Sequence, residues 1–222
     1  VSIITKEVPL DKASDYGMVV TDEEGRVLSF QEKPKPEEAL SNLASTGIYI
    51  FEPEVLDLIP SDTEFDIGSQ LFPLLVEKGV PFFAQKRFFN WIDIGNVKDY
   101  WQVSQNVLKG ELAHMTMPGT QIADGVWVGL NTRIDWEGTK IEGPVYIGSG
   151  STVEAGSTII GPTWIGHGSQ ICRGSEVTRS VLFEYTRVSP NSHMSELVVC
   201  KDYCVSRVAV SYTHLTLPTT PY

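Results

Sequence analysis

The sequence predicts an α/β layered domain followed by an all-β domain built from short repeated strands. Two observations support this prediction. In the first 110 of the 222 residues, strand-like apolar runs alternate with segments of helical period, which is typical of α/β layers. In the remainder, aliphatic residues recur at intervals of six, with small residues between them, and a fixed short period indicates a repeat architecture.

The first half begins with strands. Residues 18–21 and 26–32 are predicted to form a hairpin around the turn at 22–25, in which Gly25 supplies a positive φ. A short, continuously apolar strand is expected at 47–51. These segments predict one layer of the α/β domain.

Two helices are expected to complete that domain. Residues 68–78 carry apolar side chains on one side and stop at Gly79, after which 81–84 is predicted as another strand. Asn96 is expected to cap a last helix that ends before Gly110, because a side-chain oxygen at this position can accept a hydrogen bond from the first helical turn.

The second half repeats every six residues. Seven β-branched residues share this spacing: Ile141, Ile147, Val153, Ile159, Ile165, Ile171 and Val177. Ile122, Val128 and Ile134 continue the pattern upstream, offset by one residue. The pattern resembles the hexapeptide-repeat family of left-handed parallel β-helices, in which the aliphatic residue points into a shared core and small residues turn the corners. A β-sandwich with many turns is the alternative, and the fixed period argues against it.

The two ends of the chain break these patterns. Val1 starts inside an apolar run with no initiator Met, which we interpret as an N-terminal truncation. Residues 208–222 follow no register and resemble translated adapter sequence, so they are set aside as a non-native tail. The predicted domains are therefore 1–110 and 111–207, followed by that tail.

Composition excludes several classes of function. With 17 basic and 28 acidic residues the net charge is −11, which argues against a nucleic-acid or anionic-membrane surface. No apolar run approaches the ~20 residues that span a bilayer. Three cysteines without CxxC spacing, Cys172, Cys200 and Cys204, favour a reduced cytoplasmic compartment.

Four motifs of the first half suggest a family. They are Asp15–Val19 with Phe30–Pro34, Ala44–Phe51, Phe65–Gly68 with Leu71–Pro73, and Trp91–Gly95. In this order they resemble the C-terminal part of the Rossmann-like α/β domain of sugar-1-phosphate nucleotidyltransferases, a family in which a left-handed β-helix commonly follows. The branch that looks most similar is mannose-1-phosphate guanylyltransferase.

That resemblance implies a reaction and its substrates. An NTP and a sugar 1-phosphate would give an NDP-sugar and pyrophosphate, and the branch implies GDP-mannose from GTP and mannose 1-phosphate. ADP- or UDP-glucose synthesis stays open. No Gly-rich phosphate loop of the family occurs in the sequence, so we expect this chain to lack the nucleotide-binding half and to be inactive alone.

The resemblance also implies roles for residues that bind the sugar phosphate. Lys33 would hold the phosphate, because a cation neutralises charge there, and Glu32 would accept hydrogen bonds from sugar hydroxyls. Gly17 would let the backbone approach the sugar. The alternatives are a solvated lysine before a proline, a carboxylate at a strand end and a simple bend.

A turn and an aspartate complete the implied site. Thr46 and Gly47 match a sugar-contacting turn, and Ser45 stands where the family often has Asn, which changes the expected hydrogen bond. Asp93 matches the ligand of the catalytic Mg²⁺, a cation that requires hard oxygen ligands. Asp66 is interpreted as a capping or turn residue.

Two rival functions come from the repeats. Hexapeptide β-helices also build acyltransferases that use a histidine base, for which His167 and His193 are the candidates. A non-catalytic assembly subunit is the other possibility. In either case we expect a homo-oligomer formed through the β-helix, because stacked coils present flat faces.

Overall fold

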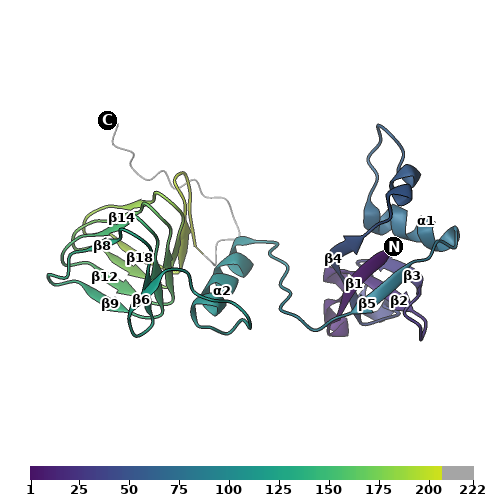
Figure 1. Ribbon diagram of the computed structural model, residues 1–222, viewed down its shortest axis with the longest axis horizontal. Coiled ribbons are helices and arrows are strands. Elements are labelled where there is room, and N and C mark those ends of the chain that lie inside the picture. The colour runs from purple at the N-terminus through teal and green to yellow at the C-terminus, as the bar shows by residue number, and fades with distance from the viewer. Residues whose placement is uncertain (207–222) are drawn as a thin grey trace. The chain divides into compact units, whose positions relative to one another are not determined.

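The computed structural model describes residues 1–206 and divides after Trp91 into two compact units (Figure 1). The second unit starts at Ile92, which is earlier than the expected domain boundary at residue 110. The predicted non-native tail, 208–222, lies outside the described residues. No helix in the described part is long and apolar enough to cross a membrane.

The first unit is built on a five-stranded sheet in the order β3-β2-β4-β1-β5. Its strands are β1 (Ser2–Glu7), β2 (Gly17–Thr21), β3 (Val27–Glu32), β4 (Leu43–Ile50) and β5 (Phe83–Lys86). The predicted hairpin is confirmed, because β2 and β3 pair antiparallel around Gly25 at φ 82°. Strand β4 begins earlier than predicted, since the buried Ala44 and Thr46 already belong to it.

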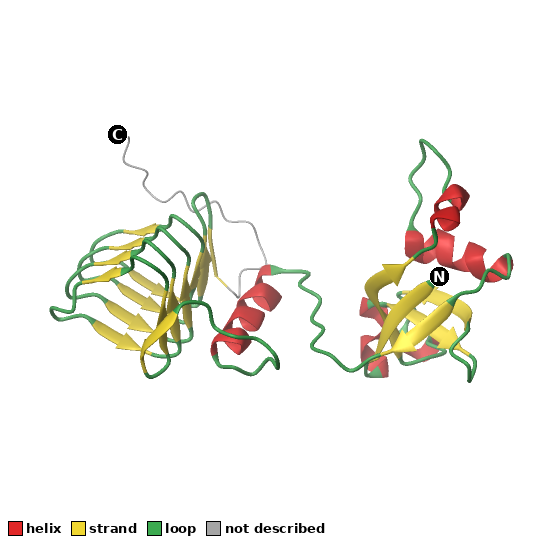
Figure 2. Cartoon of the chain, in the orientation of Figure 1, coloured by secondary structure: helices red, strands yellow, loops and turns green. Residues whose placement is uncertain are grey.

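Short helical segments surround this sheet (Figure 2). They are the 3₁₀ helices η1 (Leu10–Asp15), η2 (Pro36–Glu38) and η3 (Pro53–Leu58), the π-helical turn η4 (Ile67–Leu71) and the helix α1 (Phe72–Glu77). The helix predicted at 68–78 is therefore present, divided into a π-turn and an α-helix. Phe72 is fully buried and makes ring contacts with Phe30, Tyr49 and Phe82.

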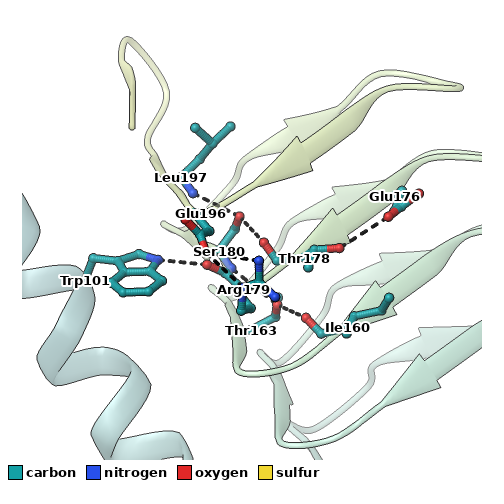
Figure 3. A network of polar contacts seen from close by, with 9 residues as sticks. All are labelled: Trp101, Ile160, Thr163, Glu176, Thr178, Arg179, Ser180, Glu196 and Leu197. Atoms are coloured by element: carbon teal, nitrogen blue, oxygen red, sulfur yellow. Dashed lines mark hydrogen bonds and ion pairs between the residues drawn. The ribbon is translucent and has the colours of Figure 1, made fainter. Parts of the chain in front are cut away.

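The first helix of the second unit is α2 (Val97–Leu108). As predicted, Asn96 caps it, its Oδ1 accepting a hydrogen bond of 2.9 Å from the Asp99 N–H. The apolar face of α2 packs on the β-helix, where the Trp101 indole donates to the Arg179 carbonyl at 2.7 Å (Figure 3) and the Tyr100 ring stacks on Phe183. This burial explains why α2 belongs to the second unit and not to the first.

Removing the indole donor should loosen this helix. Trp101 is 6% exposed, so Trp101→Phe would leave the Arg179 carbonyl without its donor while keeping an aromatic ring. We expect a loss of about 1–3 kcal/mol in the free energy of unfolding of the second unit. Urea denaturation would measure it, with Trp136→Phe as the control because that side chain is 56% exposed. Equal stabilities of both variants would contradict the anchoring role.

Three sheets of short strands form the rest of the second unit. The first, in chain order, contains β6 (Thr120–Ala123), β7 (Val126–Val128), β10 (Val145–Ile147), β13 (Thr163–Ile165), β16 (Val181–Leu182), β19 (Leu197–Val199) and β20 (Cys204–Ser206). The second contains β8 (Arg133–Ile134), β11 (Thr152–Val153), β14 (Gln170–Ile171) and β17 (Arg187–Val188). The third contains β9 (Lys140–Glu142), β12 (Thr158–Ile160), β15 (Glu176–Thr178) and β18 (His193–Ser195). Successive coils pair in parallel, so the predicted β-helix is confirmed.

The six-residue repeat forms the core of this β-helix. Six of the seven predicted positions are fully buried: Ile147, Val153, Ile159, Ile165, Ile171 and Val177. Ile141 is half-buried and packs against them. Ile122 was predicted to continue the repeat, and this is wrong: it is 46% exposed, because β6 pairs antiparallel with β7 and adds a hairpin in place of a coil.

Small residues at the corners have two physical roles. A Cβ at Gly148 would lie 2.5 Å from the His167 nitrogen, so the coils can stack only where this side chain is missing. The buried Ser151 and Ser157 hydroxyls donate to the carbonyls of Gly166 and Cys172 in the next coil, both at 3.1 Å. The corners therefore satisfy buried backbone groups that the short strands leave unpaired.

Candidate functional site

The residues implied to hold the sugar phosphate meet at the open end of the β2–β3 hairpin. Gly17 at the start of β2 is paired with Glu32 at the end of β3. Lys33 follows directly, and its N–H donates to the Tyr16 carbonyl at 3.1 Å. Lys33 has a φ of 46°, an uncommon value for a residue with a side chain. The hairpin thus turns sharply where an exposed carboxylate and an exposed ammonium stand next to each other.

The Glu32 carboxylate lies beside two glycines. A Cβ built on Gly68 would come within 2.6 Å of Glu32 Oε2, and one built on Gly17 within 3.1 Å. Gly17 also faces the Phe30 ring, 2.3 Å from where its Cβ would be. The lack of side chains at these positions makes room for the carboxylate. From the sequence, Gly68 was expected only at a helix start, and nothing in its spacing indicated the contact with Glu32.

Asp66 is the second carboxylate near Lys33. Its Oδ1 accepts hydrogen bonds from the Ser69 N–H at 2.6 Å and the Ser69 hydroxyl at 2.8 Å, so the predicted capping role is confirmed. These hydrogen bonds, with a smaller contribution from the charge of Lys33, lower the pKa of Asp66 below its usual value. The capped turn η4 therefore carries a fixed negative charge within electrostatic range of Lys33.

The predicted turn at Ser45, Thr46 and Gly47 is a bulge inside β4. The pairing of β4 with β1 shifts register there, and Gly47 has a φ of 77° with open space on the side of its missing Cβ. Thr46 is buried, and its hydroxyl donates to the Ile4 carbonyl at 2.9 Å. The Ser45 hydroxyl lies 3.2 Å from the Tyr49 hydroxyl. The Thr46 side chain is thus already engaged in the sheet, and the exposed part of this turn is Gly47.

Trp91 connects the bulge to the hairpin. Its indole N–H donates to the Thr46 carbonyl at 3.2 Å, and its ring lies 4.9 Å from the Tyr16 ring between centroids. The backbone of Tyr16 in turn accepts the hydrogen bond from Lys33. Trp91 and Tyr16 are positioning residues that the sequence argument missed, because their contacts join segments far apart in the chain.

Asp93, the predicted Mg²⁺ ligand, lies outside the first unit. It belongs to the second unit and is exposed, and in the described part of the chain its carboxylate has neither a hydrogen bond nor an ion pair. No group of three or more His, Cys, Asp or Glu side chains among the described residues could hold a metal ion. A single free carboxylate still fits Mg²⁺, which binds proteins through one or two carboxylates and completes its shell with water and phosphate oxygens. The ligand role of Asp93 stays a prediction.

The two histidines considered for acyl transfer are exposed on the β-helix, His167 in a turn and His193 at the start of β18. His167 Nδ1 is 3.9 Å from Glu184 Oε1, and His193 Nδ1 is 3.3 Å from Glu176 Oε2. Both histidine side chains are more than half exposed. Exposed pairs of this kind need no catalytic explanation.

Comparison with known proteins adds a family to this geometry. Residues 1–110 match the family model described as nucleotidyl transferase. A UTP–glucose-1-phosphate uridylyltransferase of Synechocystis sp. is 49% identical over 210 residues, which cover 95% of this chain and 54% of that protein. A glucose-1-phosphate adenylyltransferase of Bacillus thuringiensis (strain Al Hakam) is 31% identical over 208 residues, covering 90% of this chain and 48% of that protein. The chain thus spans about half the length of these curated relatives.

Proposed function

We propose, from the match of residues 1–110 to the nucleotidyl transferase family model, that the protein transfers a nucleotidyl group from an NTP to a sugar 1-phosphate. The observation that carries the proposal is the adjacency of two opposite charges, Glu32 as the last residue of β3 and Lys33 directly after it. Lys33 makes no hydrogen bond through its ammonium and no ion pair within the described residues, so this cation is free to receive a phosphate.

The two adjacent residues would divide the recognition of the substrate. The Lys33 ammonium neutralises the phosphate, while the Glu32 carboxylate, which has room beside Gly17 and Gly68, accepts hydrogen bonds from sugar hydroxyls. The Asp66 carboxylate lies within electrostatic range of this ammonium. Ser45, Thr46 and Gly47 would contribute mainly through the exposed backbone at Gly47.

The chemistry needs positioning more than a protein nucleophile. A phosphate oxygen of the sugar 1-phosphate attacks the α-phosphorus of the NTP, a new P–O bond forms, and the bond to pyrophosphate breaks. Lys33 holds the attacking group and reduces the repulsion between the two anions. We propose Asp93 as the carboxylate that would hold Mg²⁺, which when bound supplies further charge neutralisation on the phosphate oxygens.

For the substrates we propose glucose 1-phosphate and UTP. The Synechocystis and Bacillus relatives are named for glucose 1-phosphate, and the one with 49% identity is named a uridylyltransferase. Mannose 1-phosphate with GTP, which the motifs suggested, stays a prediction and is included in the test. Assembly into a homo-oligomer through the β-helix is likewise proposed, and light scattering of the purified chain would measure it.

A chimera tests the activity. Residues 1–206 of this chain would replace the aligned segment of the Synechocystis protein, and pyrophosphate release would be followed with Mg²⁺, four NTPs and either glucose or mannose 1-phosphate. Turnover with glucose 1-phosphate and UTP supports the proposal in full. If a different pair of substrates is the only one that turns over, the proposed reaction stands and the proposed substrates are replaced by that pair. A folded chimera that releases no pyrophosphate with any pair overturns the proposal, with the parent protein as the positive control.

Gly68→Ala probes the carboxylate without changing any group that would bind substrate directly. The new methyl group would lie 2.6 Å from Glu32 Oε2, so we expect the carboxylate to move and KM for the sugar 1-phosphate to rise roughly tenfold. The cost in stability should stay below about 1 kcal/mol, because a flexible side chain can move away. Gly95→Ala is the matched control, because a Cβ at Gly95 would meet open space and its φ is ordinary. Gly79→Ala is unsuitable, because Gly79 has a φ of 64°. Equal KM values in Gly68→Ala and Gly95→Ala would contradict the prediction.

A further inference from the structure

The β-helix carries a groove of its own, with a volume of about 360 Å³. Its polar lining consists of Arg133, Asp135, Thr152, Glu154 and Arg173. All five belong to the second unit, and none has a part in the site proposed above. The volume lies within the range of pockets that hold small ligands.

The strand register places these side chains on one outer face. Arg133 in β8 is paired with Thr152 in β11, and both precede a core residue, Ile134 or Val153, which points inward. Because side chains alternate along a strand, the residues that follow the core positions, Asp135 and Glu154, also face outward. The groove is therefore a property of the sheet itself and not of a single loop.

Glu154 is held rigidly in this groove. Its Oε2 accepts a hydrogen bond from the Arg173 backbone N–H at 2.9 Å, and its Oε1 accepts one from Gln170 Nε2 at 2.7 Å. These two bonds, the backbone bond first, lower the pKa of the Glu154 carboxyl. Each carboxylate oxygen can still accept another hydrogen bond, so Glu154 is a preorganised acceptor for a ligand.

The remaining charged groups are poorly matched to one another. Within the described residues, the Arg133 and Arg173 guanidinium groups have no hydrogen bond and no ion pair, and the Asp135 carboxylate accepts only the Glu137 N–H at 3.1 Å. Two arginines and two carboxylates thus line one groove without forming ion pairs with one another. A bare anion would gain from the arginines and be repelled by Asp135 and Glu154. A hydroxyl group both donates and accepts, so it can satisfy both kinds of group.

The turn that follows Asp135 carries an exposed tryptophan. Trp136 follows Asp135 directly and is 56% exposed. The register sets Arg133 opposite Thr152 and Lys140 opposite Thr158, so the turn that carries Trp136 is one residue longer than the turn of the next coil. The longer turn carries the large, exposed indole ring of Trp136. Such a ring offers an apolar face to the C–H groups of a sugar ring.

We infer that this groove binds an uncharged saccharide, with Asp135, Glu154 and the two arginines bonding to its hydroxyl groups and Trp136 covering one sugar face. The inference does not depend on the proposed nucleotidyl transfer. Its basis is the set of guanidinium and carboxylate groups that line the groove without ion pairs, together with the exposed ring of Trp136 in the turn after Asp135.

The test uses the 222-residue chain. Titration calorimetry with maltotetraose, and separately with inorganic phosphate, would measure binding to the unchanged protein and to the variants Trp136→Ala and Asp135→Asn. We expect saturable saccharide binding with a Kd on the order of 1 mM. Each variant should weaken it about tenfold or more. Tyr185→Ala, which removes another exposed ring, and Lys140→Gln, on another sheet, are the matched controls and should bind normally.

Three results would overturn the inference. One is the lack of saturable saccharide binding at about ten times the expected Kd. Another is an equal loss of binding in the variants and in the controls. The third is binding of phosphate alone, removed by Arg133→Gln, which would make the groove an anion site. Circular dichroism spectra of each variant would ensure that a loss of binding is not a loss of fold.

Discussion

Replacing Ile165 by Ala should lower the free energy of unfolding of the β-helix by about 2–5 kcal/mol. Ile165 is fully buried in β13, between the core residues Ile147 of β10 and Leu182 of β16. Parallel pairing on both sides holds the three coils at a fixed spacing. The coils therefore cannot collapse into the space that the side chain leaves, and the cavity term adds to the lost burial.

Urea denaturation followed by circular dichroism would measure this loss. Leu130→Ala is the matched control, because Leu130 lies in the same β-helix and is 79% exposed, and its stability should change by less than about 0.5 kcal/mol. If both variants lost the same free energy, the side chains at the six-residue positions would not be what holds the coils together.

Lys33→Ala should reduce kcat/KM of the chimera by about 10²- to 10³-fold. The reduction is expected because the free ammonium next to Glu32 would no longer neutralise the sugar phosphate. KM for the sugar 1-phosphate should rise while KM for the NTP changes little, since only one substrate is held by this group. Steady-state pyrophosphate release with each substrate varied in turn would separate the two constants.

Two further variants make the Lys33 result specific. Lys35→Ala removes an exposed lysine two positions away, whose nearest ion-pair partner is Glu38 at 3.7 Å, and should leave the rate unchanged. Lys33→Gln keeps the length of the side chain and removes its charge at a position where φ is 46°, so it separates charge from backbone strain. Full activity of Lys33→Gln would contradict a role in phosphate binding.

The repeated part of the fold was predicted well because its signal is local. In a β-helix, each six-residue repeat supplies the residue that its own short strand buries. The core positions from Ile147 to Val177 can therefore be read without knowledge of distant contacts. The prediction failed at Ile122, where the chain reverses and forms the antiparallel β6–β7 hairpin. Spacing alone does not record the direction of a strand.

The candidate site was predictable only in part. Glu32 and Lys33 are adjacent in sequence and stand together, and Gly17 meets them because a hairpin pairs the ends of its two strands. The contacts of Gly68 and Trp91 with this cluster cross large distances in the chain, and no local pattern encodes them. The apolar face of helix α2 was evident from the sequence, but the β-helix surface on which it packs was not.

The amino-acid sequence by itself thus determined the α/β first half, the parallel β-helix and the neighbouring pair of charges at Glu32 and Lys33, since each depends on residues close together in the chain. Only the tertiary structure decided that α2 belongs to the second unit, that Gly68 makes room for Glu32, and that Arg133, Asp135, Glu154 and Arg173 line one groove on the β-helix. These features depend on distances between side chains of distant segments, and packing sets such distances only when the whole core is formed.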